Sequence, residues 1–281
     1  MTRPALRTVF AAAAAATALL LASCASGSTP DAGESAAADD FVTPGTLTIA
    51  TGDIAYEPYV IGDDPASGEG FEAAIAYAIA DKLGFAAEDV EWVRTSFEAA
   101  IAPGPKNFDF NIQQYTITDE RRQAVDFSSP YYAASQAVVG ITGGATDGVD
   151  SIAGLKGLSL GAMAGSTSAQ TIEEVIQPDT APRLYASNED AVAAFNANQF
   201  DAFVIDLPTA FLATAMYIEN SYIVGELPVG GVADEWGVVL AKDSPLTERV
   251  SAAIDELRAD GTLEAITDEW LGAGLGVTLL Q

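Results

Sequence analysis

Hydrophobic and polar positions along this chain follow two different periods in turn, which predicts alternating strands and helices. Residues 47–51 are a short apolar run of the kind that forms a buried strand. Across residues 71–83 the apolar positions recur at helical spacing and Gly84 ends the pattern, which predicts an amphipathic helix. Further strands are predicted at 90–94, 108–112, 158–162, 202–205 and 236–241, and further helices from 96, from 118, and at 166–176, 189–198, 207–219, 247–259 and 262–271. This order of elements predicts an α/β fold with largely parallel sheets.

The predicted elements fall into two strand–helix stretches, residues 45–130 and 150–225. Extended segments near 131–140 and 226–236 join these stretches. In the second stretch, Asn188 is expected to cap the helix that follows it. No internal repeat is visible residue by residue.

The first 23 residues have the pattern of a secretory signal peptide. Arg3 and Arg7 give a positive start, and residues 9–22 are an almost unbroken apolar run. A run of about 14 residues is shorter than the ~20 needed to span a bilayer, which favours a cleaved signal over an uncleaved anchor helix. No later segment is long and apolar enough to span, so a soluble body is expected.

The end of this run, LASC at residues 21–24, resembles the bacterial lipobox, in which the cysteine becomes the first mature residue and carries lipid. Cys24 is the only cysteine, and its position favours a lipid anchor over a chance cysteine behind a secretory signal. Acyl chains such as palmitate contribute ~0.8 kcal/mol per buried CH₂, so several of them hold a protein on a membrane. Residues 24–43 are small, polar and acidic, which predicts a flexible tether before a folded part that starts near Pro44.

Composition excludes several classes of function. The chain has 281 residues, 12 Lys and Arg, 40 Asp and Glu, one Cys and no His, with a formal net charge of −28. Without His there is no Ser-His-Asp or Cys-His catalytic unit, and a single Cys forms neither an internal disulfide nor a Cys-rich metal site. The negative charge argues against a nucleic-acid partner, because phosphate binding requires clustered cations. No metal or cofactor is expected.

Two segments could bind an anion. Arg121 follows the predicted strand at 108–112, at the strand end where open α/β sheets bind ligands, and its planar guanidinium suits a carboxylate. The alternative is a surface arginine paired with Asp119 or Glu120. Residues 164–168 follow a strand and open a helix, so their N–H groups and hydroxyls would face an anion there, unless they only cap the helix.

Two of the many acids also lie at strand ends. Asp206 ends the strand at 202–205, and Asp53 follows the strand at 47–51. Each is either a ligand contact or an ordinary helix cap or loop charge. Tyr56 and Tyr59 are either aromatic ligand contacts or part of the core.

The order of several segments resembles bacterial extracellular solute-binding proteins of family 3, the amino-acid receptors of ABC importers. The segments are LTIATGDIAYEPYV, GEGFEAAIAYAIADKLGF, FDFNIQQYTITDERRQAVDFSSPYY, LKGLSLGAMAGSTSA, FDAFVIDLPTA and LRADGTLEAITDEWLG. The resemblance runs from about residue 45 to 272, and the stretches TITDERRQAVDFSSPYY and ADGTLEAITDEWLG are the most specific. It implies a type II periplasmic-binding-protein-like fold, with two α/β lobes joined by two crossover strands. The lobes would be residues 44–133 plus 235–281 and residues 134–234.

The resemblance also implies residue roles around one bound amino acid. Arg121 would hold the α-carboxylate with help from Thr116 and Thr167, and Asp206 would pair with the α-ammonium. Tyr56 and Phe97 would form walls around the side chain, with Asp53 nearby. Opposite charges at both ends suit a zwitterion taken out of water.

Three positions depart from the family pattern. Gln114 stands where Gly or Ser is usual, so a bulky amide is expected in the pocket. Met163 adds no charge beside the 164–168 turn, and Glu72 replaces the usual Asp. Together Asp53, Glu57 and Gln114 favour a ligand with a polar or cationic side chain.

The resemblance therefore implies a monomeric, membrane-anchored receptor outside the cytoplasm that passes its ligand to the permease subunits of an ABC transporter. Two alternatives stay open. One is a dehydratase-type enzyme on the same scaffold, which an intact Asp206 opposite Arg121 disfavours. The other is a receptor that senses a ligand without transport.

Overall fold

The computed structural model of the protein describes residues 40–228, 234–272 and 277–281. All of these belong to one compact unit, residues 37–281. The predicted signal peptide and Cys24 lie outside the described residues. Within the described ranges, no helix has the length and apolar character needed to cross a membrane.

A mixed five-stranded sheet forms the centre of the first lobe, in the order β2-β1-β3-β12-β4. Its strands are β1 (Leu47–Gly52), β2 (Val90–Thr95), β3 (Phe110–Asn111), β4 (Val125–Phe127) and β12 (Val239–Ala241). Its helices are α1 (Phe71–Lys82), α2 (Phe97–Ile101), α7 (Thr247–Ala259) and α8 (Thr262–Trp270), with 3₁₀ turns at Ile61–Asp63, Pro65–Ser67, Ala87–Asp89 and Arg121–Gln123. Every residue of β1 is buried. Because both faces of β1 are covered, its sequence lacks charged residues, and even Thr48 and Thr51 are buried.

A second mixed sheet forms the centre of the other lobe, in the order β10-β6-β9-β7-β8. Its strands are β6 (Gln136–Ile141), β7 (Leu160–Met163), β8 (Arg183–Tyr185), β9 (Ala202–Asp206) and β10 (Ser221–Glu226). Its helices are α3 (Ile152–Leu155), α4 (Thr167–Thr171), α5 (Asn188–Asn196) and α6 (Leu207–Leu212), with π-helical turns Ile172–Ile176 after α4 and Ala213–Tyr217 after α6. Two apolar clusters, one containing Phe195 and Phe203 and the other Leu160 and Val204, pack in this lobe.

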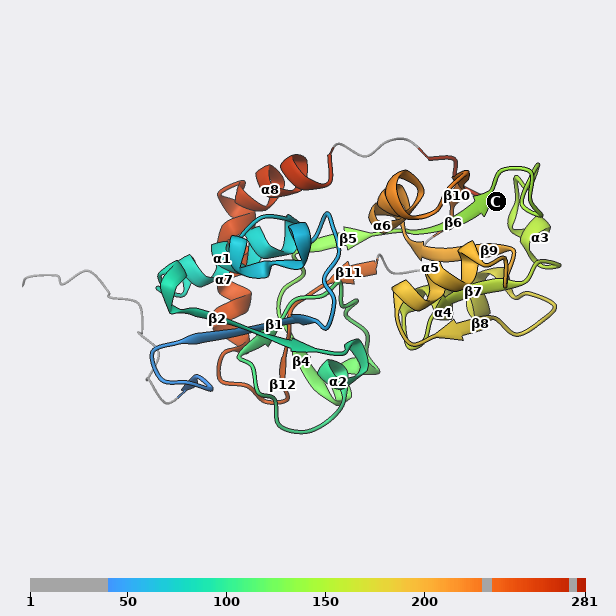
Figure 1. The fold of residues 1–281 in the computed structure, drawn as a ribbon. Coiled ribbons are helices and arrows are strands. Elements are labelled where there is room, and N and C mark those ends of the chain that lie inside the picture. Colours follow the sequence, from blue (N-terminus) through green and yellow to red (C-terminus); the bar gives the residue numbers. More distant parts are fainter. Residues whose placement is uncertain (1–39, 229–233, 273–276) are drawn as a thin grey trace, which may run out of the picture. The chain divides into compact units, whose positions relative to one another are not determined.

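Two short strands connect the lobes. β5 (Tyr132–Ala134) precedes β6, and β11 (Asp234–Trp236) precedes β12. β5 and β11 pair with each other in antiparallel orientation (Figure 1). Trp236 is fully buried, with its ring 5.0 Å from that of Tyr132 and 5.8 Å from that of Tyr59. This aromatic packing holds the crossover strands beside the first lobe.

The sheets are mixed, where the sequence predicted largely parallel ones. β1 is parallel to β2 and β3, but β12 is antiparallel to β3 and β4. In the second sheet β7 is parallel to β8 and β9, whereas β6 is antiparallel to β9 and β10. The antiparallel strands follow the crossovers, and the direction in which a crossover enters a sheet is not encoded in local periodicity.

Three predicted elements need correction. The strand expected at 236–241 is two strands in two sheets, separated by Gly237, where a Cβ would lie 2.9 Å from Cδ1 of Ile117. The helix expected from 118 is only the 3₁₀ turn Arg121–Gln123. The side-chain cap of α5 is Ser187 rather than Asn188, because the Ser187 hydroxyl accepts from Asp190 N at 3.1 Å.

Both ends of the folded part also differ from the prediction. Phe41, assigned to the tether, is 9% exposed and packs edge-on against Phe85 at 4.9 Å, so the folded part includes the last tether residues. At the other end, residues 277–281 were assigned to the first lobe. Leu280 is instead 1% exposed in an apolar cluster of the second lobe, and its N–H donates to Glu226 O at 2.8 Å. In both cases the burial of an apolar side chain, Phe41 or Leu280, attaches the segment to the folded part.

Candidate functional site

The loop after β3 carries the polar side chains of the first lobe, and Gln114 has an unusual backbone there. Its φ is 47°, in the left-handed region that favours glycine. Its N–H donates to Glu72 Oε1 at 2.8 Å, and its side-chain amide donates to Glu72 Oε2. Both carboxylate oxygens of Glu72, on α1, therefore hold the loop. This explains how a glutamine is accommodated where the resemblance expects Gly or Ser.

Glu72 lies behind the loop as a buried anchor. It is 1% exposed and also accepts a hydrogen bond from the Tyr131 hydroxyl. Burial raises the pKa of Glu72 to about 7. Gln114 lines the cavity, as the sequence predicted, and its side-chain amide nitrogen donates to Glu72.

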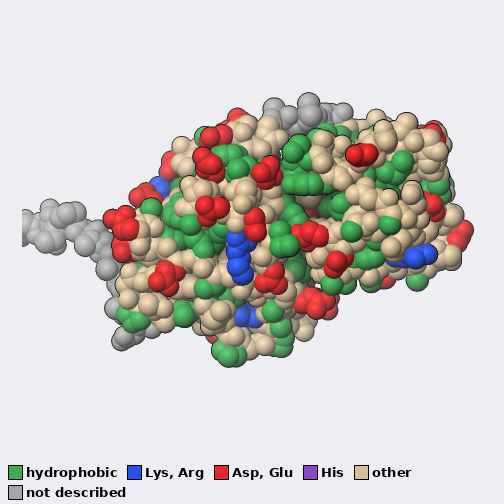
Figure 2. Space-filling view, in the orientation of Figure 1, with side chains coloured by type: hydrophobic (Ala, Val, Ile, Leu, Met, Phe, Trp, Pro, Cys, Tyr) green, Lys and Arg blue, Asp and Glu red, His purple; other side chains and the backbone are tan. Residues whose placement is uncertain are grey.

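Arg121 is the only buried Lys or Arg among the described residues, at 8% exposed. The visible face in Figure 2 carries scattered acidic side chains and few basic ones. The Nη1 of Arg121 donates to Thr116 O at 2.7 Å and its Nη2 donates to Gly165 O at 2.9 Å, which joins the two lobes. Its Cζ lies 5.3 Å from the centre of the Phe97 ring, which stacks on Tyr115 at 4.5 Å.

The guanidinium of Arg121 has no carboxylate partner within 4.0 Å among the described residues. Burial lowers the pKa of Arg121, yet an arginine stays protonated in proteins. The surface pairing with Asp119 or Glu120, which the sequence left open, is therefore not formed. A buried cation held only by carbonyls can still accept an anion.

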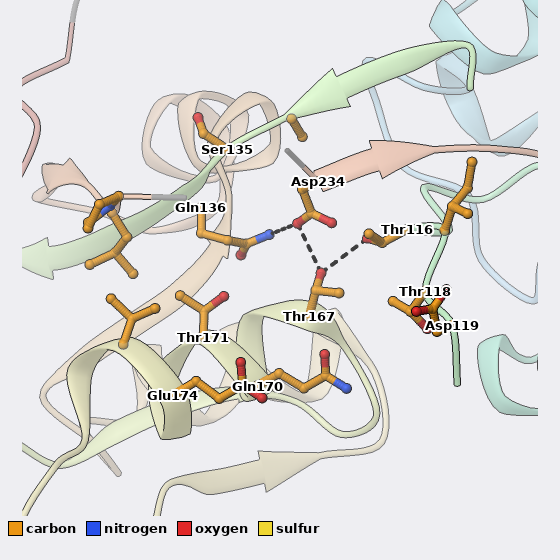
Figure 3. Close-up of a pocket in the computed structure, with 15 residues that line it drawn as sticks. Thr116, Thr118, Asp119, Ser135, Gln136, Thr167, Gln170, Thr171, Glu174 and Asp234 are labelled. Atoms are coloured by element: carbon orange, nitrogen blue, oxygen red, sulfur yellow. Dashed lines mark hydrogen bonds between the residues drawn. The ribbon is translucent and has the colours of Figure 1, made fainter. Parts of the chain in front are cut away.

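Thr116 and Thr167 face each other from the two lobes. Their hydroxyl oxygens are 3.2 Å apart, and Thr167 Oγ1 also donates to Asp234 Oδ2 at 3.0 Å (Figure 3). Thr167 begins α4, which Ser166 caps by accepting from Ala169 N at 3.1 Å. The capping function of this segment therefore belongs to Ser166, which leaves the Thr167 hydroxyl directed to the site.

Asp206 ends β9 and is held by side chains rather than by the backbone. Gln136 Nε2 donates to Asp206 Oδ1 and to Asp234 Oδ2, each at 2.6 Å. Ser168 Oγ donates to Gln136 Oε1 at 2.7 Å, which fixes the orientation of the amide. Burial, and then the nearby charge of Asp234, raise the pKa of Asp206. Asp206 makes no side-chain cap to α6, so the capping alternative does not hold.

One cavity of ≈ 350 Å³ contains all eight ligand-binding residues predicted from the sequence. They are Asp53, Tyr56, Phe97, Gln114, Thr116, Arg121, Thr167 and Asp206. Tyr59, the other aromatic candidate, is instead in the core at 1% exposed, and its hydroxyl is 2.8 Å from Thr209 Oγ1. Met163 also lines the cavity and contributes no charge there.

Tyr56 shares this cavity with Glu189, a residue that the sequence did not single out. Burial and the Glu189 carboxylate raise the pKa of Tyr56. Glu189 lies in the first turn of α5, where an acid reads as an ordinary helix start, so no local signal distinguished it. Asp53 is exposed at the same cavity.

Two neighbouring cavities share residues with this site. A polar one of ≈ 340 Å³ includes Thr116, Thr167 and Asp234 (Figure 3). A more apolar one of ≈ 510 Å³ includes Tyr56 and Glu189. The ≈ 350 Å³ cavity alone combines Arg121 with Asp206, so it is the one suited to a zwitterion.

Gln136 and Asp234 were missed by sequence reasoning. They are 98 positions apart, on different crossover segments, and the fold brings them together. Neither stands at the end of a predicted β-α unit, which was the signal that found Arg121 and Asp206. No group of three or more Cys, Asp or Glu suited to a metal ion occurs within the described ranges.

The structure belongs to the type II class of periplasmic binding proteins. This class is defined by two α/β lobes, paired crossover strands, and a cavity with a guanidinium on one side and a carboxylate on the other. Comparison with known families gives the membership. Residues 47–273 match the family described as bacterial extracellular solute-binding proteins, family 3, and the chain belongs to this family.

The relatives are named as amino-acid-binding proteins. The chain is 29% identical over 206 residues to the arginine-binding extracellular protein ArtP of Bacillus subtilis (strain 168), covering 72% of this chain and 77% of ArtP. An ancestral arginine-binding protein bound to glutamine has 32% identity and a TM-score of 0.69, covering 82% of this chain and 99% of that one. The ancestral amino acid-binding protein AncCDT-1, a precursor of cyclohexadienyl dehydratase, has 29% identity and a TM-score of 0.67, covering 81% and 95%.

Proposed function

We propose that this protein captures one free amino acid between its lobes and delivers it to the permease subunits of an ABC transporter. The observation that carries the proposal is Arg121, a buried guanidinium without an acid partner among the described residues, in the same cavity as Asp206. A free amino acid brings a carboxylate for the first and an ammonium for the second. Burying both ends of a zwitterion is favourable only when each has an opposite partner.

The lobes contribute opposite halves of this recognition. Arg121 and Thr116 come from the first lobe, whereas Thr167 and Asp206 come from the second. A ligand that touches both sets binds the closed arrangement better than an open one. It therefore shifts the population towards closure, as a hinge-type binding protein requires.

For the side chain of the ligand we infer a polar or cationic group. Asp53, Tyr56, Glu189 and the bound amide of Gln114 supply polar or negative surface beside the anchor groups. The names of the relatives, which include arginine-binding proteins and one bound to glutamine, agree with such a ligand.

A thermal-shift series against the common amino acids tests the proposal. A ligand that binds only the folded state adds about 2.7 kcal/mol to the free energy of unfolding at a hundredfold excess over Kd. This added stability raises the melting temperature. We expect one polar or cationic amino acid, or a small group of them, to give a clear shift. Calorimetry then gives its affinity, and no shift with any amino acid would refute the proposal.

We further infer that the mature chain starts at a lipidated Cys24 and stays on the outer side of the cell membrane as a monomer. The lipobox-like sequence and the single cysteine support the lipid anchor. Cys24→Ser should release the protein into the medium or periplasm, as read by fractionation. Retention in the membrane fraction would contradict the anchor.

A dehydratase activity is the second candidate, because one similar structure is named as a precursor of cyclohexadienyl dehydratase. Asp206 opposite Arg121 favours a zwitterion over a dicarboxylic ring substrate. Incubation with prephenate or arogenate should give no turnover. Product formation that depends on Asp206 would replace the binding proposal with an enzymatic one.

A further inference from the structure

Two carboxyl groups share one amide: Asp206 lines the ≈ 350 Å³ cavity, and Asp234 lines the ≈ 340 Å³ cavity beside it. Asp206 Oδ1 and Asp234 Oδ2 each accept from Gln136 Nε2 at 2.6 Å (Figure 3 shows the Asp234 side). The other oxygen of Asp234, Oδ1, is buried and has no hydrogen-bond partner among the described residues. Asp234 is 9% exposed. A buried carboxylate oxygen without a hydrogen-bond donor from the protein is costly if it carries full charge.

The surrounding charges do not neutralise the pair. Arg121 acts on both carboxyls, but no ion pair within 4.0 Å joins it to either one in the described part of the chain. The other titratable groups that face Asp206 are Glu72, Tyr59 and Tyr132. None of these supplies positive charge. Two carboxyls in such surroundings do not both ionise readily.

The hydroxyl groups beside the pair have a defined order. Thr167 donates its single proton to Asp234 Oδ2, so in the 3.2 Å contact between the threonines Thr116 must be the donor.

We propose that Asp234 is a positioning residue for the ammonium site: its carboxyl group, held by the same Gln136 amide, keeps one proton on Asp206 in the empty cavity, and that proton is lost when the ligand ammonium binds Asp206. This inference rests on the proposed function. The ammonium group keeps its protons. The O–H bond of the pair breaks, its electrons stay on the carboxylate oxygen, and the proton passes to the buffer. The ammonium then takes over the positive charge that the proton supplied.

Calorimetry in two buffers tests the proposal, with L-arginine or L-glutamine as the probe, whichever gives the larger thermal shift. Phosphate and Tris take up protons with different heats, so the difference in binding heat at about pH 7 counts the protons released. We expect release of close to one proton per ligand from the wild type and clearly less from Asp234→Asn, in which burial alone still favours a proton on Asp206. Glu72→Gln, which removes a buried carboxyl of the first lobe, should release protons as the wild type does.

A second measurement needs only the wild type. Neither probe changes its own charge between about pH 5 and 7, so release of one proton predicts that affinity rises about tenfold per pH unit there. Affinity that is flat with pH, with heats that do not depend on the buffer, would overturn the inference while binding itself stands. Release that disappears in Glu72→Gln but persists in Asp234→Asn would also overturn it. If no amino acid binds, the proposed function fails, and this inference with it.

Discussion

The two sides of the cavity hold their key charges by different means. On the first-lobe side, Arg121 is held by two backbone carbonyls and an aromatic ring. On the second-lobe side, Asp206 is held by the side chain of Gln136, which also binds Asp234. Carbonyls and arginine do not titrate near neutral pH, whereas carboxyl pairs do. The anion-binding side should therefore be insensitive to pH and the cation-binding side sensitive to it.

The largest effect is expected on removing the cation of the first side. Arg121→Ala should cost about 2–5 kcal/mol of ligand binding, because it leaves a buried carboxylate without its partner. Calorimetry measures the loss. Arg122→Ala removes the neighbouring, exposed arginine and should bind as the wild type does. Equal affinities for Arg121→Ala and the wild type would remove Arg121 from the site.

Glu72, which holds the Gln114 loop behind the first-lobe side, is the group on that side that titrates near neutral pH. Its folded pKa of about 7 lies above the ordinary value of 4.5. Its contribution to stability is therefore complete below the unfolded pKa and is lost as pH rises through the folded pKa. The loss should approach about 3 kcal/mol in the free energy of unfolding.

Urea unfolding of the empty protein at about pH 5 and pH 8 checks this prediction. Glu72→Gln should show a smaller decrease between the two values than the wild type. Glu69→Gln, which changes an exposed glutamate on the same lobe, serves as the control and should keep the full decrease. An unchanged pH dependence in Glu72→Gln would argue that Glu72 has an ordinary pKa.

On the second side, Asp206→Asn keeps an oxygen for Gln136 but removes the charge. We expect a loss of about 1–2 kcal/mol in ligand binding, since the interaction with the ammonium becomes a neutral hydrogen bond. The empty protein should become more stable at neutral pH, because the raised pKa of Asp206 means that ionisation opposes folding there. Calorimetry and thermal unfolding test both, and exposed Asp179→Asn is the control. A destabilised empty protein would contradict the assignment.

The smallest effect concerns the ring beside the arginine. Phe97→Leu removes the cation–π contact of 5.3 Å with Arg121 and should weaken ligand binding by about 0.5–1 kcal/mol. Phe97→Tyr keeps the ring and should bind normally. Equal losses in both variants would show that shape, and not the ring, matters at this position.

Sequence reasoning found residues that stand where a strand ends or a helix begins. Asp206 ends a strand and Thr167 follows a turn that leads into a helix, so their positions pointed to the site, whereas Arg121 was marked by the family motif in which it stands. Gln136 and Asp234 lie on crossover segments without such a motif, so nothing local marked them. Glu189 was missed for a different reason: it lies in the first turn of a helix, where an acidic residue is common and does not by itself indicate a site.

By itself, the sequence determined the α/β alternation, because periodicity is a local property of the chain, and its motifs carried the resemblance to the family, which in turn implied the eight residues that share one cavity. Tertiary structure decided the mixed direction of the strands, the return of residues 277–281 to the second lobe and the partnership of Asp206 with Asp234. It also decided which charges are withdrawn from water. Those features depend on groups distant in the sequence coming within hydrogen-bond distance, and burial then sets the energy of their charges.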